Sequence, residues 1–164
     1  MLRRNFVAAA GTISALLFGS ESVGAAGNRR DDQGEQHGAQ DARPTPPAKT
    51  VLHLSGGEKS AYQGALMNAK NLLDDDSVPV KDLILVANGP GVKVYTPPSE
   101  GDNEFADLIN SLQERGVTFR ACENAMDMFD LTEDDLLDGV ETVPSAVGEL
   151  ARLQELDYGY IKAP

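Results

Sequence analysis

The sequence contains one cysteine, few basic residues and no tryptophan, and two of these shortages exclude whole classes of protein. Its single cysteine, Cys122, cannot form an internal disulfide, so an exported form of the chain would carry an unpaired thiol. The chain has 14 Lys and Arg against 26 Asp and Glu, a formal net charge of −12. Because binding to phosphate needs clusters of Lys and Arg, this charge excludes nucleic acid and anionic membrane surfaces as partners.

The acidic excess belongs entirely to the part of the chain after residue 47. Residues 1–47 hold equal numbers of acidic and basic side chains. Abundant Asp, few Lys and no Trp resemble the composition of proteins from salt-loving organisms, in which high salt screens the self-repulsion of the surface. An ordinary acidic surface is the alternative interpretation.

Residues 1–26 have the features of an export signal in the usual order. Arg3-Arg4 followed by Phe6 resembles the twin-arginine signal. The apolar run from Phe6 to Phe18 has the length of a signal's apolar region and is too short to span a membrane. Val23-Gly24-Ala25 suits cleavage after Ala25. We therefore expect export as a folded domain. An uncleaved leader that tethers the protein to the membrane and a misassigned start codon remain alternatives.

The rest of the chain divides into a linker and one domain. Residues 27–49 are rich in Gly, Gln, Asp and Pro and lack large apolar side chains, which predicts a disordered linker. Residues 50–164 alternate apolar strands with amphipathic helices. That alternation predicts an α/β domain, a three-layer α/β/α sandwich around a five-stranded, mainly parallel sheet.

The expected elements follow from hydrophobic spacing and from turn residues. Strands are expected at 51–54, 83–87, 117–122, 140–143 and 158–161, with a further short extended piece at 92–95. Helices are expected to begin near Glu58, at Asp102 or Asn103, near Asn124, at Thr132 and at Ser145. The last of these helices is expected to bury Val147, Leu150, Leu153 and Leu156.

Cys122 is the best candidate for a catalytic residue. It is expected at the carboxyl end of a parallel strand, where open α/β sheets place their chemistry. Amides at the start of the following helix would favour its thiolate, and Arg120 on the same strand face would add positive charge. Glu123 and Asp127 oppose the thiolate electrostatically. The alternative is a small buried apolar residue at a strand end, a role that cysteine often has.

A glycine-containing turn supplies candidate ligand-binding residues. Asn88, Gly89 and Gly91 follow a buried strand, and the glycines allow backbone amides to approach an anion or a persulfide closely. An ordinary turn is the alternative. His53, at the end of the first strand, is either a base beside the thiol or a histidine satisfied within the fold. Asn124 either orients a ligand or caps the short helix.

No metal site is predicted. The acidic residues Glu123, Asp127 and Asp130 are not accompanied by clustered His or Cys ligands, so we interpret them as a solvated acidic surface.

Four separated motifs resemble those of the DsrE/DsrF-like family, in the same order and across residues 50–163. They are Ala87-Asn88-Gly89-Pro90-Gly91, Phe119-Arg120-Ala121-Cys122-Glu123-Asn124, Val143-Pro144-Ser145 and Gly159-Tyr160-Ile161-Lys162. The resemblance, strongest to the small stand-alone members, implies a three-layer α/β fold that assembles as homotrimers or hexamers. In the sulfur-relay members a cysteine at this place carries a persulfide between proteins, and only Cys122 matches it. The leader departs from the usual cytoplasmic member, so the settings of tRNA modification and dissimilatory sulfur metabolism do not follow.

The sequence leaves two functions open. In the first, an exported DsrE-like protein carries or binds sulfur as a persulfide on Cys122, exchanges it with a sulfur donor or acceptor protein, and needs no cofactor. Such a carrier is not an enzyme in the turnover sense. In the second, the protein is a non-catalytic module that binds a small ligand or assembles as a homo-oligomer, and Cys122 is structural.

Overall fold

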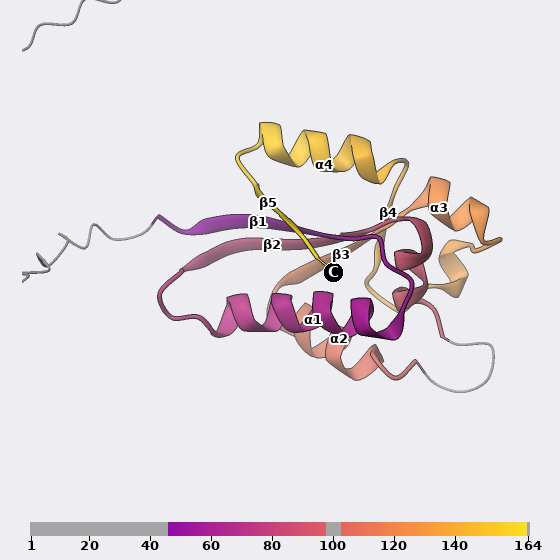
Figure 1. Cartoon of the computed structure of the whole chain (residues 1–164), viewed down its shortest axis with the longest axis horizontal. Coiled ribbons are helices and arrows are strands. Elements are labelled where there is room, and N and C mark those ends of the chain that lie inside the picture. The colour runs from indigo at the N-terminus through magenta and orange to yellow at the C-terminus, as the bar shows by residue number, and fades with distance from the viewer. Residues whose placement is uncertain (1–45, 98–102, 164) are drawn as a thin grey trace, which may run out of the picture. The chain divides into compact units, whose positions relative to one another are not determined.

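The computed structural model describes residues 46–97 and 103–163 (Figure 1). The predicted leader and residues 27–45 of the predicted linker lie outside these ranges. The first strand begins at Ala48, two residues inside the predicted linker, and Ala48 already pairs with Val80 of the neighbouring strand. No helix in the described ranges is long and apolar enough to cross a membrane.

Five strands form a single sheet, and every neighbouring pair is parallel. The order across the sheet is β4-β3-β2-β1-β5. The central strand β2 is buried from Leu83 to Ala87, as expected for a parallel strand covered on both faces. The predicted five-stranded α/β fold is therefore confirmed. The strands are β1 (Ala48–Leu54), β2 (Val80–Ala87), β3 (Val117–Cys122), β4 (Glu141–Val143) and β5 (Gly159–Lys162).

Helices cover both faces of this sheet. Figure 1 shows α1 and α2 together on one face and α4, drawn in yellow, on the other. Gly116 follows α2 with a φ of +92°, a conformation that glycine adopts without strain, and so lets the chain turn into β3. The helices are α1 (Lys59–Asp74), α2 (Ala106–Glu114), α3 (Glu123–Met128) and α4 (Ala146–Glu155), with two short 3₁₀ helices, η1 (Gly89–Tyr95) and η2 (Glu133–Asp135).

Two local predictions were wrong. Residues 92–95 are not extended but belong to η1, because Gly89 at a φ of +48° and the bond from the Gly91 N–H to the Asn88 carbonyl wind the chain immediately after β2. Val147 in α4 and Leu156 just after its end are 69% and 46% exposed, although Leu150 and Leu153 are buried as predicted. Residues three apart turn by about 300°, so four residues at this spacing drift around the helix and cannot share one face.

The connection through α4 determines which residues meet at the end of the sheet. β4 and β5 form opposite edges of the sheet, so the segment that contains α4 spans it. As a result β5, the last strand of the chain, pairs with β1, the first. His53 of β1 lies in register with Lys162 of β5 and with Val86 of β2. The carboxyl ends of the three strands therefore bring together segments that are distant in sequence.

Candidate functional site

Cys122 is the last residue of β3, and its sulfur lies against the start of α4. The side chain is buried, with 5% of its surface exposed. Its Sγ accepts a hydrogen bond from the backbone N–H of Ala146, the first residue of α4, at 3.3 Å. An N–H group directed at sulfur favours the negatively charged thiolate, and the positive end of the helix dipole adds to this effect. The amide beside the thiol therefore comes from α4 and not from α3, the helix that follows Cys122.

Ser145 holds the start of α4 in place. Its Oγ accepts a hydrogen bond from the backbone N–H of Gly148 at 3.4 Å, which is the N-cap arrangement expected of a serine at this position. Ser145 was predicted to cap the last helix, and this prediction is confirmed. Because Ser145 directly precedes Ala146 and its cap holds the first turn of α4, the cap also helps to hold the donor that contacts Cys122.

A pocket of about 280 Å³ opens onto the thiol. Asn88 and Gly89 contribute to it from the end of β2, and Asn124 from α3, so the fold brings three of the candidate ligand-binding residues to Cys122. Met128 and Val147 also line the pocket and are 74% and 69% exposed, so its rim is apolar. The remaining lining residues are Ala125, Ser145 and Ala146.

Gly91 does not line this pocket, and the structure gives it a packing role. A Cβ atom at this position would lie 2.8 Å from the carbonyl oxygen of Leu54, closer than real Cβ contacts allow. η1 can therefore approach the end of β1 only with glycine at this position.

His53 does not line the pocket either, but it contacts a residue that does. Its Nε2 lies 3.0 Å from Oδ1 of Asn88, and its Nδ1 lies 2.9 Å from the hydroxyl oxygen of Tyr160. Burial lowers the pKa of His53, the nearby Lys162 charge lowers it further, and the hydrogen bond with Asn88 opposes them. The ring is therefore neutral at pH 7, and both of its nitrogens are engaged by residues other than Cys122.

Arg120 does not supply the compensating charge that was predicted for the thiolate. Its Nε donates to Glu141 at 2.8 Å, and its Nη1 is paired with Glu149. Glu149 is buried and also receives two hydrogen bonds from Arg152, at 2.7 and 2.8 Å. These bonds from Arg152, helped by the charges of both arginines, hold the pKa of Glu149 below its usual value of 4.5 despite the opposing effect of burial. The carboxylates of Glu141 and Glu149 thus neutralise the charge of Arg120. Through these two ion pairs, Arg120 connects β4 to α4.

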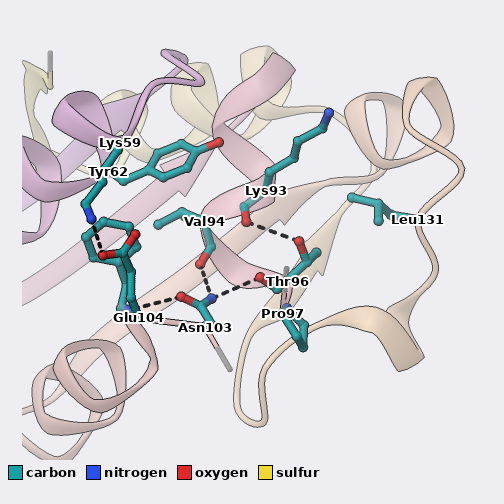
Figure 2. A pocket seen from close by; sticks show the side chains of 10 residues that line it. Lys59, Tyr62, Lys93, Val94, Thr96, Pro97, Asn103, Glu104 and Leu131 are labelled. Atoms are coloured by element: carbon teal, nitrogen blue, oxygen red, sulfur yellow. Dashed lines mark hydrogen bonds and ion pairs between the residues drawn. The ribbon is translucent and has the colours of Figure 1, made fainter. Parts of the chain in front are cut away.

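A larger cavity, of about 450 Å³, lies beside η1 and the starts of α1 and α2 (Figure 2). Several of its polar groups bond to one another. Lys59 is paired with Glu104, and Nδ2 of Asn103 donates to the carbonyls of Val94 and Thr96 at 2.8 and 3.0 Å. Lys93 extends away from Asn103 in Figure 2, and its Nζ lies 4.0 Å from the ring centre of Phe129. No thiol lines this cavity, so the pocket at Cys122 is the candidate active site.

Comparison with known families matches residues 49–163 to the DsrE/DsrF-like family. The chain belongs to this family. The match spans all five strands, so the DsrE/DsrF-like assignment covers the candidate site as well as the fold. No curated protein matches the chain.

Solved structures support the assignment. This DsrE/DsrF-like chain is 32% identical to MTH1491, a protein of unknown function from Methanobacterium thermoautotrophicum, with a TM-score of 0.62 over 70% of this chain and 98% of that one. It is 24% identical to the ychN protein of E. coli, with a TM-score of 0.54, and the match covers 70% of this chain and 98% of that one. It is 15% identical to BT1422, a protein of unknown function from Bacteroides thetaiotaomicron, with a TM-score of 0.53, and the match covers 70% of this chain and 93% of that one. The last two likenesses concern the fold alone.

Two features of the site were missed by reasoning from the sequence. The contact of the Ala146 amide with Cys122 has a sequence signal, since Pro144-Ser145 predicts the capped start of a helix after a strand. Tyr160, which holds the ring of His53, has none, because nothing local shows that β5 lies beside β1. In this DsrE/DsrF-like domain the polar surroundings of the thiol therefore depend on long-range contacts.

Proposed function

We propose that this DsrE/DsrF-like protein carries sulfur as a persulfide on Cys122. The observation that supports the proposal most directly is the hydrogen bond from the Ala146 N–H to Sγ at the base of an open pocket. A sulfur carrier needs a thiolate, since the thiolate is the nucleophile that attacks a donor. Here the N–H of Ala146, at the start of α4, supplies a donor hydrogen bond to that sulfur.

The transfer is an exchange between two sulfur compounds. The Cys122 thiolate attacks the outer sulfur of a donor persulfide, R–S–SH, and a new S–S bond forms at Sγ. The S–S bond of the donor breaks, and the donor leaves as the thiolate R–S⁻, so Cys122 becomes a persulfide without an added oxidant or reductant. Attack by an acceptor thiol reverses the exchange and restores Cys122. The protein is then a carrier that shuttles between a donor and an acceptor, which are proteins or small thiols.

The pocket suits the loaded form. The outer sulfur extends from Sγ into the space of about 280 Å³, where Asn88 and Asn124 provide polar groups. The exposed side chains of Met128 and Val147 provide an apolar rim around the pocket. The open pocket leaves the outer sulfur accessible to a partner that covers this apolar rim.

The burial of Cys122 favours a second candidate function. With 5% of its surface exposed, the side chain is also suited to packing between β3 and α4. In that case the protein is a binding or assembly module with no reactive thiol, and the pocket holds a small ligand.

Intact-mass spectrometry of the full chain separates the two functions. The protein is incubated with inorganic polysulfide at high salt, beside the variant Cys122→Ser. Sulfur carriage predicts that the wild type gains the mass of one sulfur atom, that dithiothreitol removes it, and that the variant gains nothing. The carrier function is rejected if the wild type gains no sulfur and Cys122 reacts with iodoacetamide only after unfolding. That result would support the packing role.

A further inference from the structure

The backbone of Asn88 is held on both sides by hydrogen bonds. Its N–H donates to the carbonyl of Leu54 at the end of β1, at 3.0 Å, and its own carbonyl accepts from the Gly91 N–H at 3.0 Å. Asn88 is also the residue before η1, in an extended conformation with a φ of −139° and a ψ of 175°. The position from which its side chain starts is thus set by β1 and by η1.

His53 then determines the orientation of the Asn88 side-chain amide, because it binds the oxygen Oδ1 and leaves Nδ2 on the other side. The oxygen Oδ1 can only accept, so the His53 Nε2 at 3.0 Å must carry the proton. In the neutral ring Nδ1 is consequently the acceptor, and it receives the hydroxyl of Tyr160 at 2.9 Å. The donors form one chain, from Tyr160 to His53 and from His53 to Asn88. A ring held in this way keeps Oδ1 on the β1 side of Asn88.

The other end of the amide is the part of Asn88 available to the thiol pocket. Asn88 and Cys122 line the same pocket, and within residues 46–97 and 103–163 the Nδ2 group of Asn88 forms no hydrogen bond. We propose that His53 is a positioning residue, which orients the Asn88 amide so that its N–H group is presented to the sulfur of Cys122. In the structure the Ala146 amide is the donor that contacts Sγ, and the Asn88 N–H would join it as a second donor once the sulfur is charged or carries the outer sulfur of the persulfide.

This inference rests on the proposed function, because it gives Asn88 the role of stabilising the Cys122 thiolate and the outer sulfur of its persulfide. A side-chain N–H is a better partner for a sulfur anion than for a neutral thiol. The role of His53 is therefore indirect. It is distinct from the general base considered from the sequence, since its Nε2 donates to Asn88 and removes no proton from Cys122.

Four variants of the full chain test the assignment. They are Asn88→Ala, His53→Leu, His53→Gln and the double variant that combines Asn88→Ala with His53→Leu. The readout is the rate of Cys122 alkylation by iodoacetamide as a function of pH, with folding checked by circular dichroism. If the Asn88 N–H donates to the sulfur anion, losing that donor predicts that Asn88→Ala and His53→Leu each slow alkylation at pH 7 by about threefold to tenfold and shift the profile to higher pH. His53→Gln keeps an N–H donor toward Asn88 and should recover most of the rate.

The double variant separates positioning from independent effects. If His53 acts through Asn88, the double variant is no slower than Asn88→Ala alone. Additive losses, or a His53→Leu profile that equals the wild type, would overturn the assignment. A ¹⁵N spectrum of the His53 ring provides a second check, since the structure requires the proton on Nε2, and a proton on Nδ1 alone would also overturn it.

The proposed function and this inference fail in different ways. A wild type that gains no sulfur from polysulfide removes the carrier function, while the alkylation profiles still show whether Asn88 stabilises the thiolate. A wild type that gains sulfur, with alkylation and persulfide lifetime unchanged in Asn88→Ala, removes only the positioning role.

Discussion

The backbone N–H of Ala146 donates to Sγ of Cys122 at 3.3 Å and so joins the start of α4 to the end of β3. The two residues are separated by 24 positions in the sequence. The bond makes the properties of the thiol depend on how well the first turn of α4 is held. Variants of Ser145 and Glu149 test how α4 is held. A variant of Gly91 tests the packing of η1 in the fold around the site.

Ser145→Ala removes the N-cap of α4. We expect the free energy of unfolding to fall by about 1 kcal/mol, the usual cost of losing such a cap. Because the first turn then frays, the Ala146 amide is less well placed, and Cys122 alkylation at pH 7 should also slow. Urea denaturation and the iodoacetamide rate measure the two effects. Ser145→Thr, which keeps a capping oxygen, is the matched control, and an unchanged alkylation rate in Ser145→Ala would show that the cap does not support the thiol.

Glu149→Gln breaks two ion pairs, one that joins α4 to Arg120 of β3 and one with Arg152 within α4. Glu149 loses its charge while Arg120 stays half-buried, so we expect the free energy of unfolding at pH 7 to fall by about 2 kcal/mol. Glu155→Gln makes the same chemical change at an exposed position of α4 and should stay within about 0.5 kcal/mol of the wild type. Equal stabilities of the two variants in urea would contradict the structural importance of the Glu149 pairs.

The same residue contributes to the pH dependence of stability. The pKa of Glu149 is lower in the folded protein than its usual 4.5, so folding favours the charged form. Its contribution is present above about pH 4.5 and is lost as the pH falls through the folded-state pKa. Denaturation curves between pH 7 and pH 3 should therefore show a smaller loss of stability in Glu149→Gln than in the wild type. Parallel losses would show that other carboxylates account for the acid sensitivity.

Gly91→Ala should damage the fold and not the chemistry. The added Cβ would meet the Leu54 carbonyl at 2.8 Å, and relieving that contact by moving η1 is expected to cost about 1–3 kcal/mol. Gly116→Ala is a useful comparison, because it has open space for the Cβ and is strained only by its φ of +92°. Per folded molecule, Gly91→Ala should still gain one sulfur atom from polysulfide. Full stability of this variant would contradict the close approach of η1 to β1.

The fold could be predicted from the sequence because its signals are local. The apolar run at Leu83–Ala87 indicates a buried parallel strand, Gly116 marks the end of a helix, and Ser145 marks the start of another. The predictions failed where a local pattern was ambiguous. Val147 and Leu156 are apolar and regularly spaced, yet spacing by three does not keep residues on one face of a helix.

The site could be predicted only in part, for a different reason. Cys122, Asn88 and Asn124 each follow or end an element whose position in the sheet is recognisable, so their meeting in one pocket follows from the parallel order of the strands. The contact between His53 and Tyr160 requires β5 to lie beside β1, which depends on α4 spanning the sheet. Arg120 was assigned to the thiol because its actual partners, Glu141 and Glu149, are 21 and 29 residues away in sequence.

The route of α4 across the sheet ties reactivity to the completion of folding. The amide at Cys122 comes from the start of α4, and the hydroxyl that holds His53 comes from β5 at the end of the same segment. An intermediate that has assembled β1, β2 and β3 but has not yet docked the last twenty residues contains the cysteine without either support. Under the proposed function, the loss of both supports would slow the loading of sulfur onto Cys122 in such an intermediate. The rate of sulfur loading would therefore report on whether the chain has finished folding.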